Sequence, residues 1–352
     1  MATFVQNAGK VKLIDIAVNL TDCVFRGISW KGKPMHPDDF DQVILRAKNA
    51  GVDKIIVSGT SMEVSQKAVE LCKQNRGFLY CTVGVHPAHC NELFFPLATQ
   101  PEASKPKSPT SSTVATPVAM DKEFAKSQLG KLRSLIDGNR DVVVGIGEIG
   151  LDYAEEKLCS REVQRHGFEL QLEMAKAYQL PLFLHSRDCG MDFVDVIAPF
   201  RSNFHRGVVH SFNGSPQELD ALLAMKLHIG INGSSLREKE TAEAILRVTP
   251  LDALVVESDA PWCDIRKDHY AFSFIKTHFE SSPKEKFQMG KCVQRRNEPC
   301  HCLQVLEALY GIRADVVSQA PAGCVVGPAM SFEEFAAKIY GNTVELFPSV
   351  QL

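Results

Sequence analysis

The sequence predicts an α/β protein built as a (β/α)8 TIM barrel. Short β-branched runs alternate with helix-like stretches along most of the chain. The runs have continuously apolar cores, which is typical of strands buried on both faces of a parallel sheet. Eight such strand–helix units follow one another, the number that closes a barrel. A doubly wound open sheet is the structural alternative.

Each expected strand is a short apolar run followed by a turn or a polar residue. The cores at 54–57 (Lys-Ile-Ile-Val), 142–146 (Val-Val-Val-Gly-Ile) and 254–256 (Leu-Val-Val) are the clearest. The expected strands are residues 12–20, 54–60, 79–87, 142–152, 181–186, 207–212, 228–236 and 254–262.

Amphipathic segments separate these strands and are expected to cover the barrel as helices. A last helix, at 331–347, is expected to close the fold. The other expected helices are residues 37–50, 62–75, 121–137, 160–178, 188–200, 216–225, 238–248 and 299–310.

Two segments interrupt this alternation. Residues 96–119 are rich in Pro, Ser, Thr and Lys and poor in apolar residues, which predicts a flexible insertion. The 263–296 loop follows the eighth strand and carries eight Lys/Arg, four acidic residues and five interleaved Tyr or Phe. It could hold an anionic, stackable substrate, or its aromatic side chains could simply pack onto the barrel.

The composition excludes several classes of protein. The chain has 352 residues, with 39 Lys+Arg against 42 Asp+Glu and a net charge near −3. With 45% hydrophobic residues it is neither a disordered tail protein nor a collagen-like chain. It is not a polybasic nucleic-acid binder, so any binding of phosphate groups must come from a local basic patch or a metal.

The same features predict an intracellular protein of the cytoplasm or nucleus. No apolar run reaches the roughly 18 residues of a membrane span, and residues 1–12 lack a signal peptide's apolar stretch. Eleven irregularly spaced cysteines do not form a secreted disulfide framework. We expect one domain, residues 1–352, with no membrane contact and no obligate protein partner.

Four polar residues fall at the ends of apolar runs. Glu148, His185 and His210 end the fourth, fifth and sixth expected strands, and Asp259 ends the eighth. In a barrel all four side chains converge at the C-terminal mouth, where such folds build their active sites. Taken singly, a strand-end histidine can be a structural residue and a strand-end aspartate a helix cap.

Two imidazoles and two carboxylates at one mouth can form a divalent-metal site. Oxygen ligands suit Mg²⁺ or Mn²⁺, and imidazoles equally suit Zn²⁺. A bound cation lowers the pKa of its water and polarises a carbonyl or phosphoryl oxygen. The barrel is therefore expected to be of the metal-dependent hydrolase type.

Three further residues end strands near the same mouth. His86 could bind or protonate substrate, or be a structural histidine before a proline turn. Asp15 and Asn19 close the first strand, and Asp15 could be a weak ligand or orient a histidine.

The Cys300-His301-Cys302 stretch, with Cys292 upstream, superficially suggests zinc. Its spacing is not that of a structural zinc knuckle. We interpret Asn297 as a helix cap and the cysteines as packing residues.

At the strand-end residues described above, the sequence resembles the TatD family of metal-dependent deoxyribonucleases, which belongs to the amidohydrolase-like barrels. It looks most similar to the eukaryotic members of that family. The resemblance spans residues 12 to about 348, interrupted at 96–119. The matching stretches are residues 14–22, 84–87, 147–153, 185–187, 210–214, 257–262, 296–299 and 340–347.

The resemblance implies divalent-cation-dependent hydrolysis of DNA phosphodiesters, often from the 3′ end of single strands. The family's metal ligands carry over to the four strand-end residues already singled out. His86, Arg187 and Asn213, which lie in matching stretches, are expected to contact the substrate.

The first strand departs from the family pattern. Many relatives have His-x-His where this chain has Ala17 and Asn19. A second metal site that depends on this pair should be weakened or absent. We expect one tightly held cation, Mg²⁺ first and Zn²⁺ or Mn²⁺ as alternatives, with a second recruited alongside substrate phosphate.

Together these observations predict a metal-dependent nuclease that acts on single-stranded DNA. Its catalytic residues would be Glu148, Asp259 and His86, with Asp259 both binding the cation and accepting a proton from the attacking water. His86 would position the phosphate or assist the leaving group. A small-molecule amidohydrolase on the same barrel is one alternative, and a non-catalytic nucleic-acid-binding scaffold is the other.

Overall fold

The structure is a computed structural model that describes residues 11–96, 120–319 and 330–351. The predicted insertion at 96–119 lies outside the described residues apart from Pro96.

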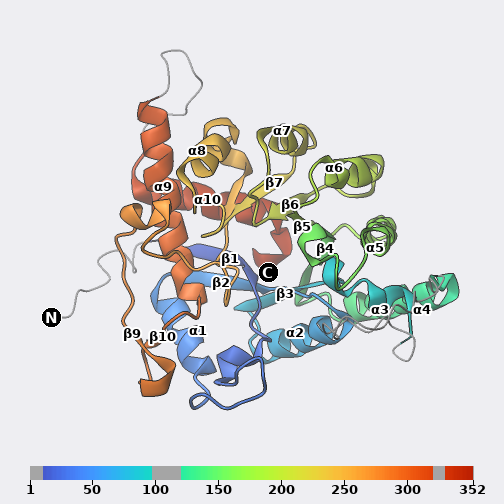
Figure 1. The fold of residues 1–352 in the computed structure, drawn as a ribbon, viewed down its shortest axis with the longest axis horizontal. Helices are drawn as coiled ribbons and strands as arrows, with labels where there is room; N and C mark the ends of the chain where they lie inside the picture. The colour runs from blue at the N-terminus through green and yellow to red at the C-terminus, as the bar shows by residue number, and fades with distance from the viewer. Residues whose placement is uncertain (1–10, 97–119, 320–329, 352) are drawn as a thin grey trace, which may run out of the picture.

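Eight parallel strands form one sheet whose order follows the chain (Figure 1). The sheet closes between its first and last strands, because Asp259 donates its backbone N–H to the carbonyl of Ala17 at 2.9 Å and Asn19 donates to Ala260 at 2.8 Å. This confirms the predicted (β/α)8 barrel. The strands are β1 (Leu13–Val18), β2 (Val52–Val57), β3 (Leu79–Val83), β4 (Val143–Asp152), β5 (Leu182–Arg187), β6 (Gly207–His210), β7 (His228–Ile231) and β8 (Leu254–Val256).

Helices surround the barrel, one or more after each strand (Figure 1). Several begin at side-chain caps where the sequence has Ser or Asp, as at Ser61, Asp121 and Ser160. The helices are α1 (Phe40–Asn49), α2 (Met62–Gln74), α3 (Asn91–Phe94), α4 (Lys122–Asp137), α5 (Arg161–Ala175), α6 (Met191–Ile197), α7 (Pro216–Ala224), α8 (Lys239–Val248), α9 (Cys302–Ser318) and α10 (Phe332–Leu346).

Two cores result from this arrangement. The larger lies between the strands and the surrounding helices. The smaller fills the barrel with alternating strand residues such as Ile16, Val144 and Phe183. The end of α10 adds Leu346 and Phe347 to this inner core, so the predicted last helix closes the barrel from within.

Some boundaries differ from the prediction. Strand β8 ends at Val256 instead of Trp262, although Asp259 still donates its backbone N–H to Ala17 of β1 beyond that end. Asn297 is not a helix cap, since Glu298 occupies that position before the 3-10 turn Pro299–His301.

Helix α9 runs to Ser318 instead of ending at Tyr310. Its continuation keeps Ile312 and Val316 buried. Gly311 lies within this helix and allows the 263–296 loop to approach closely: a β-carbon there would lie 2.5 Å from the ring of Phe274.

Within the described residues, no helix combines the length and apolar character needed to cross a membrane.

Candidate active site

The C-terminal ends of the strands surround an open cavity of about 860 Å³. Its wall includes Glu148 from β4, His185 from β5, His210 from β6 and Asp259 from the segment after β8. His185 and His210 are register partners on neighbouring strands, so they lie at the same level of the barrel. All four predicted metal ligands therefore face one cavity.

Glu148 lies inside β4, not at its end as predicted. The register between β4 and β5 shifts between Ile146 and Ile149, where the chain presses against the neighbouring strand. A β-carbon on Gly147 would lie 2.3 Å from the carbonyl oxygen of Phe183. Glycine at 147 therefore permits the register shift next to Glu148, whose side chain faces the barrel mouth.

The Glu148 carboxylate is the centre of a histidine cluster. Its Oε1 atom lies 2.7 Å from Nδ1 of His185, 2.8 Å from Nε2 of His210 and 3.4 Å from Nε2 of His86. Burial alone would raise the pKa of Glu148, but the His210 charge and the hydrogen bonds from the imidazoles hold it well below its ordinary value. The carboxylate is therefore ionised.

These donors fit a divalent cation. Nδ1 of His185 lies 3.0 Å from Nε2 of His210, although two ring nitrogens cannot both present hydrogens to each other. A cation bonded at about 2.1 Å would hold neighbouring donors roughly 3.0–3.4 Å apart. The three donor atoms therefore need only small side-chain shifts to bind one ion. Glu148, His185 and His210 form such a group, with donors all within 4.8 Å of one another.

Each imidazole is also held from its far side by a carboxylate. Nε2 of His185 lies 3.2 Å from Asp152, and Nδ1 of His210 lies 3.4 Å from Glu257. Such outer carboxylates orient metal-binding histidines and raise their basicity. Sequence reasoning assigned no role to Asp152 or Glu257, although both lie in the stretches that resembled the TatD family.

The same contacts raise the pKa values of the two imidazoles. Burial alone would lower the pKa of His185, but hydrogen bonds to Asp152 and Glu148 raise it. Burial acts in the same direction on His210, yet the charges of Glu148 and Glu257 raise its pKa well above the ordinary value.

We therefore expect cation binding to release protons. A protonated imidazole cannot bind a metal, so the cation must displace the protons that the raised pKa values retain. Affinity for Mn²⁺ should consequently fall as the pH falls through the neutral range. Calorimetric titration in two buffers of different ionisation enthalpy measures the protons released, and Glu148→Gln should reduce their number. An affinity that is flat with pH would contradict this prediction.

His86 lies beside the group as a neutral donor. Burial and the neighbouring His185 lower its pKa to about 3. Its Nδ1 accepts the backbone N–H of Ala88 at 3.1 Å, which leaves the ring hydrogen on Nε2, the atom that faces Glu148. His86, Asp152 and His185 form a second group of possible ligands, with donor atoms within 4.8 Å of one another.

Asp259 also lines the cavity but is not part of either group. Burial, together with the charges of Glu257 and Glu148, raises its pKa to about 7. Asn19 donates to its Oδ1 atom at 3.3 Å, and the Cys263 thiol donates to its Oδ2 atom at 3.2 Å.

The remaining predicted residues divide between the rim and the barrel wall. Arg187 and Asn213 line the cavity, and Arg187 lies 3.6 Å from Asp152. Asp15 does not contact a histidine: it accepts the backbone N–H of Ser258 at 2.8 Å, and burial raises its pKa to about 8.

Two tryptophans that sequence reasoning missed stack at the edge of the mouth. Their ring centroids lie 4.7 Å apart at an interplanar angle of 12°. Trp30 is 63% exposed and Trp262 45% exposed, and Trp262 lines the cavity. The Asp22 carboxylate fixes Trp30 by accepting its indole N–H at 3.0 Å.

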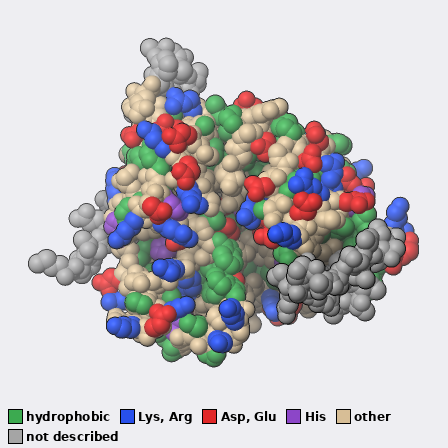
Figure 2. Space-filling model, viewed as in Figure 1, with side chains coloured by type: hydrophobic (Ala, Val, Ile, Leu, Met, Phe, Trp, Pro, Cys, Tyr) green, Lys and Arg blue, Asp and Glu red, His purple; other side chains and the backbone are tan. Residues whose placement is uncertain are grey.

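The 263–296 loop divides its aromatic residues between two roles. Tyr270, Phe274 and Phe279 pack against the core, as the simpler interpretation expected. Phe287 instead stacks on His36, with centroids 4.5 Å apart. Figure 2 shows basic and acidic side chains intermixed over the face it presents, without one continuous basic patch.

Comparison with known proteins identifies relatives over nearly the whole chain. The model of the TatD related DNase family matches residues 14–348. "Deoxyribonuclease Tat-D" of Schizosaccharomyces pombe is 35% identical over 341 residues, covering 96% of each chain. "3'-5' ssDNA/RNA exonuclease TatD" of Erwinia billingiae is 31% identical and covers 86% of this chain and 92% of its own.

Two solved structures are also similar to this chain over nearly its whole length. A hydrolase of the TatD family from Entamoeba histolytica superposes with a TM-score of 0.78 at 29% identity, covering 96% of this chain and 98% of its own. A protein described as an amidohydrolase from Saccharomyces cerevisiae gives 0.79 at 28% identity, covering 96% and 100%.

Proposed function

The chain belongs to the TatD family of deoxyribonucleases and is an enzyme of that hydrolase class. We propose that it removes nucleotides from the 3′ end of single-stranded DNA with the help of a divalent cation. The observation that carries the proposal is the convergence of Glu148, His185 and His210 in an open cavity. The name of the Erwinia billingiae relative, a 3'-5' exonuclease of single-stranded DNA and RNA, supports the direction and the strand preference.

In this proposal Glu148, His185 and His210 would hold the cation, with Asp259 as a further ligand. When bound, the cation supplies a water of lowered pKa and polarises the phosphoryl oxygen. Mg²⁺ is our first choice because DNA presents hard phosphate oxygens, with Mn²⁺ and Zn²⁺ as alternatives.

In this proposal one side chain of the protein accepts a proton and the others position the phosphates of the substrate. Asp259 accepts the proton of the attacking water, since its carboxylate lines the cavity together with the other three ligands. His86, whose low pKa keeps it neutral, donates its Nε2 hydrogen to the scissile phosphate and does not protonate the leaving group. Arg187 and Asn213 contact the flanking phosphate from the rim.

The stacked tryptophans support a single-stranded substrate. An unpaired base exposes the face that stacks on an aromatic ring, whereas duplex bases are already stacked on each other. Trp262 lines the cavity, so a base lying on the Trp30–Trp262 pair would place its neighbouring phosphate near the mouth.

We therefore expect Trp262→Ala to weaken binding of single-stranded DNA. Loss of one base–aromatic stack, about 1–3 kcal/mol, corresponds to a roughly 5- to 150-fold rise in KM with little change in kcat. Steady-state kinetics on a single-stranded oligonucleotide measures both constants. Trp262→Phe keeps an aromatic face and is the matched control. A fall in kcat at unchanged KM would contradict the assignment.

The location of the protein is inferred from its thiols. All ten cysteines of the described residues are free. This supports the intracellular location, cytoplasm or nucleus, inferred from the sequence.

The experiment that tests the proposed function follows the release of nucleotides from single-stranded DNA labelled at either end. Mg²⁺, Mn²⁺ and Zn²⁺ are compared with EDTA, and a duplex of the same sequence is the matched control. We expect cation-dependent release of the 3′ label first, and slower release from the duplex. An enzyme inert on DNA with every cation would favour the small-molecule amidohydrolase instead.

A further inference from the structure

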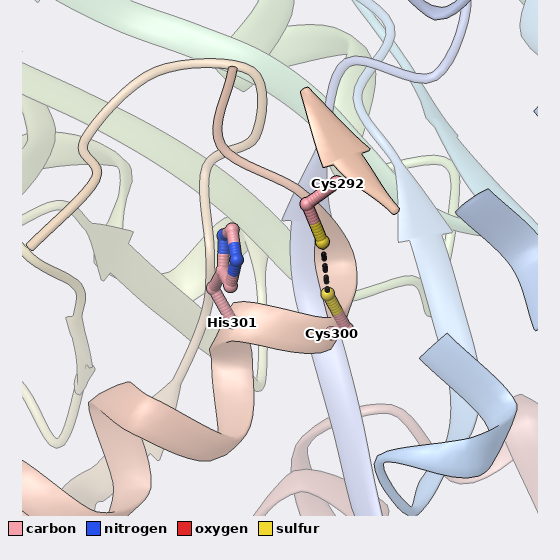
Figure 3. Close-up of side chains that lie close together, drawn as sticks. All are labelled: Cys292, Cys300 and His301. Atoms are coloured by element: carbon pink, nitrogen blue, oxygen red, sulfur yellow. Dashed lines mark hydrogen bonds between the residues drawn. The ribbon is translucent and has the colours of Figure 1, made fainter. Parts of the chain in front are cut away.

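Two thiols and an imidazole come together outside the barrel cavity, where the 263–296 loop returns to the barrel. Cys292 lies in the short strand β10 (Cys292–Val293), and Cys300 and His301 lie in the 3-10 turn that leads into α9. Figure 3 shows the Cys292 sulfur facing the Cys300 sulfur, with His301 beside them. None of the three lines the barrel cavity.

We propose that Cys292, Cys300 and His301 bind a thiophilic divalent cation, Zn²⁺, at a site separate from the barrel mouth. The sulfur atoms lie 4.0 Å apart, and a ring nitrogen of His301 completes a group whose donor atoms all lie within 4.8 Å of one another. Two sulfurs bonded to a tetrahedral Zn²⁺ at about 2.3 Å are separated by roughly 3.8 Å. The thiols are thus already close to the separation that the ion requires.

The contacts of Asn297 prepare the imidazole for this role. Its amide nitrogen donates to the carbonyls of Ser258 at 2.8 Å and of Trp262 at 2.5 Å, which identifies its other atom as an oxygen. That oxygen lies 2.8 Å from Nδ1 of His301. The backbone N–H of Glu298 is shared between this oxygen, at 3.0 Å, and Nδ1 of His301, at 3.2 Å. The shorter contact is to the oxygen, which favours the tautomer with the ring hydrogen on Nδ1 and a lone pair on the other ring nitrogen. Outer hydrogen bonds of this kind are typical of zinc-bound histidines.

Burial explains why a cation would be retained. Cys292 is 2% exposed and Cys300 fully buried, and the ring of Phe279 lies 5.3 Å from that of His301. Two thiolates and one Zn²⁺ are neutral together, which removes the cost of burying the charges separately. A disulfide is the competing outcome, but its sulfurs would have to approach from 4.0 Å to about 2.05 Å.

The ion would fasten the returning end of the 263–296 loop to the start of α9. It would therefore stabilise the fold through contacts that do not touch DNA. Because binding is independent of nucleotide release, failure of this inference and failure of the proposed nuclease activity are separate results.

The test is a titration of the chelator-treated, reduced full-length chain with Cd²⁺, followed by the ultraviolet charge-transfer absorption that only sulfur ligands give. We expect the band to saturate at one ion per chain, to disappear in Cys292→Ser and Cys300→Ser, and to need more Cd²⁺ in His301→Gln. Cys302→Ser is the matched control, since Cys302 is equally buried but lies outside the cluster. Cys263→Ser excludes the thiol beside Asp259.

A wild-type measurement covers the case in which a variant fails to fold. X-ray absorption of the Zn²⁺-loaded protein should show sulfur neighbours at about 2.3 Å. Only nitrogen and oxygen neighbours, a band that survives both serine variants, or a Cys292–Cys300 disulfide found by peptide mapping would overturn the inference.

Discussion

Asp259→Asn is expected to lower kcat for nucleotide release by roughly 10²–10⁴-fold, the usual contribution of a general base. The amide keeps the shape of the side chain and the hydrogen bond to the Cys263 thiol, but it cannot accept a proton from water. KM for DNA should change little, because the tryptophan pair and the rim residues remain. Single-turnover kinetics on a 3′-labelled oligonucleotide measures the chemical step directly.

Asp264→Asn is the matched control for this variant. Asp264 lies five residues further along, bonds to Arg266 at 3.3 Å and does not line the cavity. The Asp264→Asn substitution makes the same chemical change outside the cavity. Full activity in Asp259→Asn would show that the base lies elsewhere. A wild type that releases nucleotides no faster than the variant, both at a negligible rate, would favour the nucleic-acid-binding scaffold.

Arg296→Met should lower the free energy of unfolding by about 3–5 kcal/mol, because it removes one partner from a buried ionic network. The Arg296 guanidinium donates to both oxygens of Asp39, at 2.8 and 2.6 Å, and to Glu298 at 2.8 Å. Arg46 donates to the same two acids, at 3.1 and 2.8 Å. Methionine fills much of the volume but leaves the two buried carboxylates with a single cation.

Chemical denaturation monitored by circular dichroism measures this loss. Lys126→Met is the matched control, since Lys126 pairs with Glu123 on the exposed face of α4 and such pairs contribute at most about 1 kcal/mol. Equal stability losses in the two variants would show that the buried network does not hold the 263–296 loop to α1.

The barrel and its mouth were predictable because they follow from local patterns. Continuously apolar runs identified the strands, and a polar residue after or within a run identified Glu148, His185 and His210. Parallel strands in a barrel bring such residues to one end whatever the loops between them do. The prediction therefore depended little on exact boundaries, and β8 could end early without moving Asp259 from the cavity.

The contacts around these residues were not predictable, since they depend on register and on long-range packing. Asp152 reaches His185 because β4 continues past an irregularity at Gly147, and Glu257 reaches His210 from two strands away. The Trp30–Trp262 stack joins loops at opposite ends of the chain. No short sequence pattern predicts such pairs.

Anomalous X-ray scattering from a Mn²⁺-loaded crystal is the most direct test of whether the donors at the barrel mouth hold the catalytic cation. We expect an anomalous peak bonded to Glu148, His185 and His210, and its loss in Glu148→Gln. If the protein cleaves DNA with Mn²⁺ while its anomalous peak lies away from these three residues, the catalytic cation is held elsewhere.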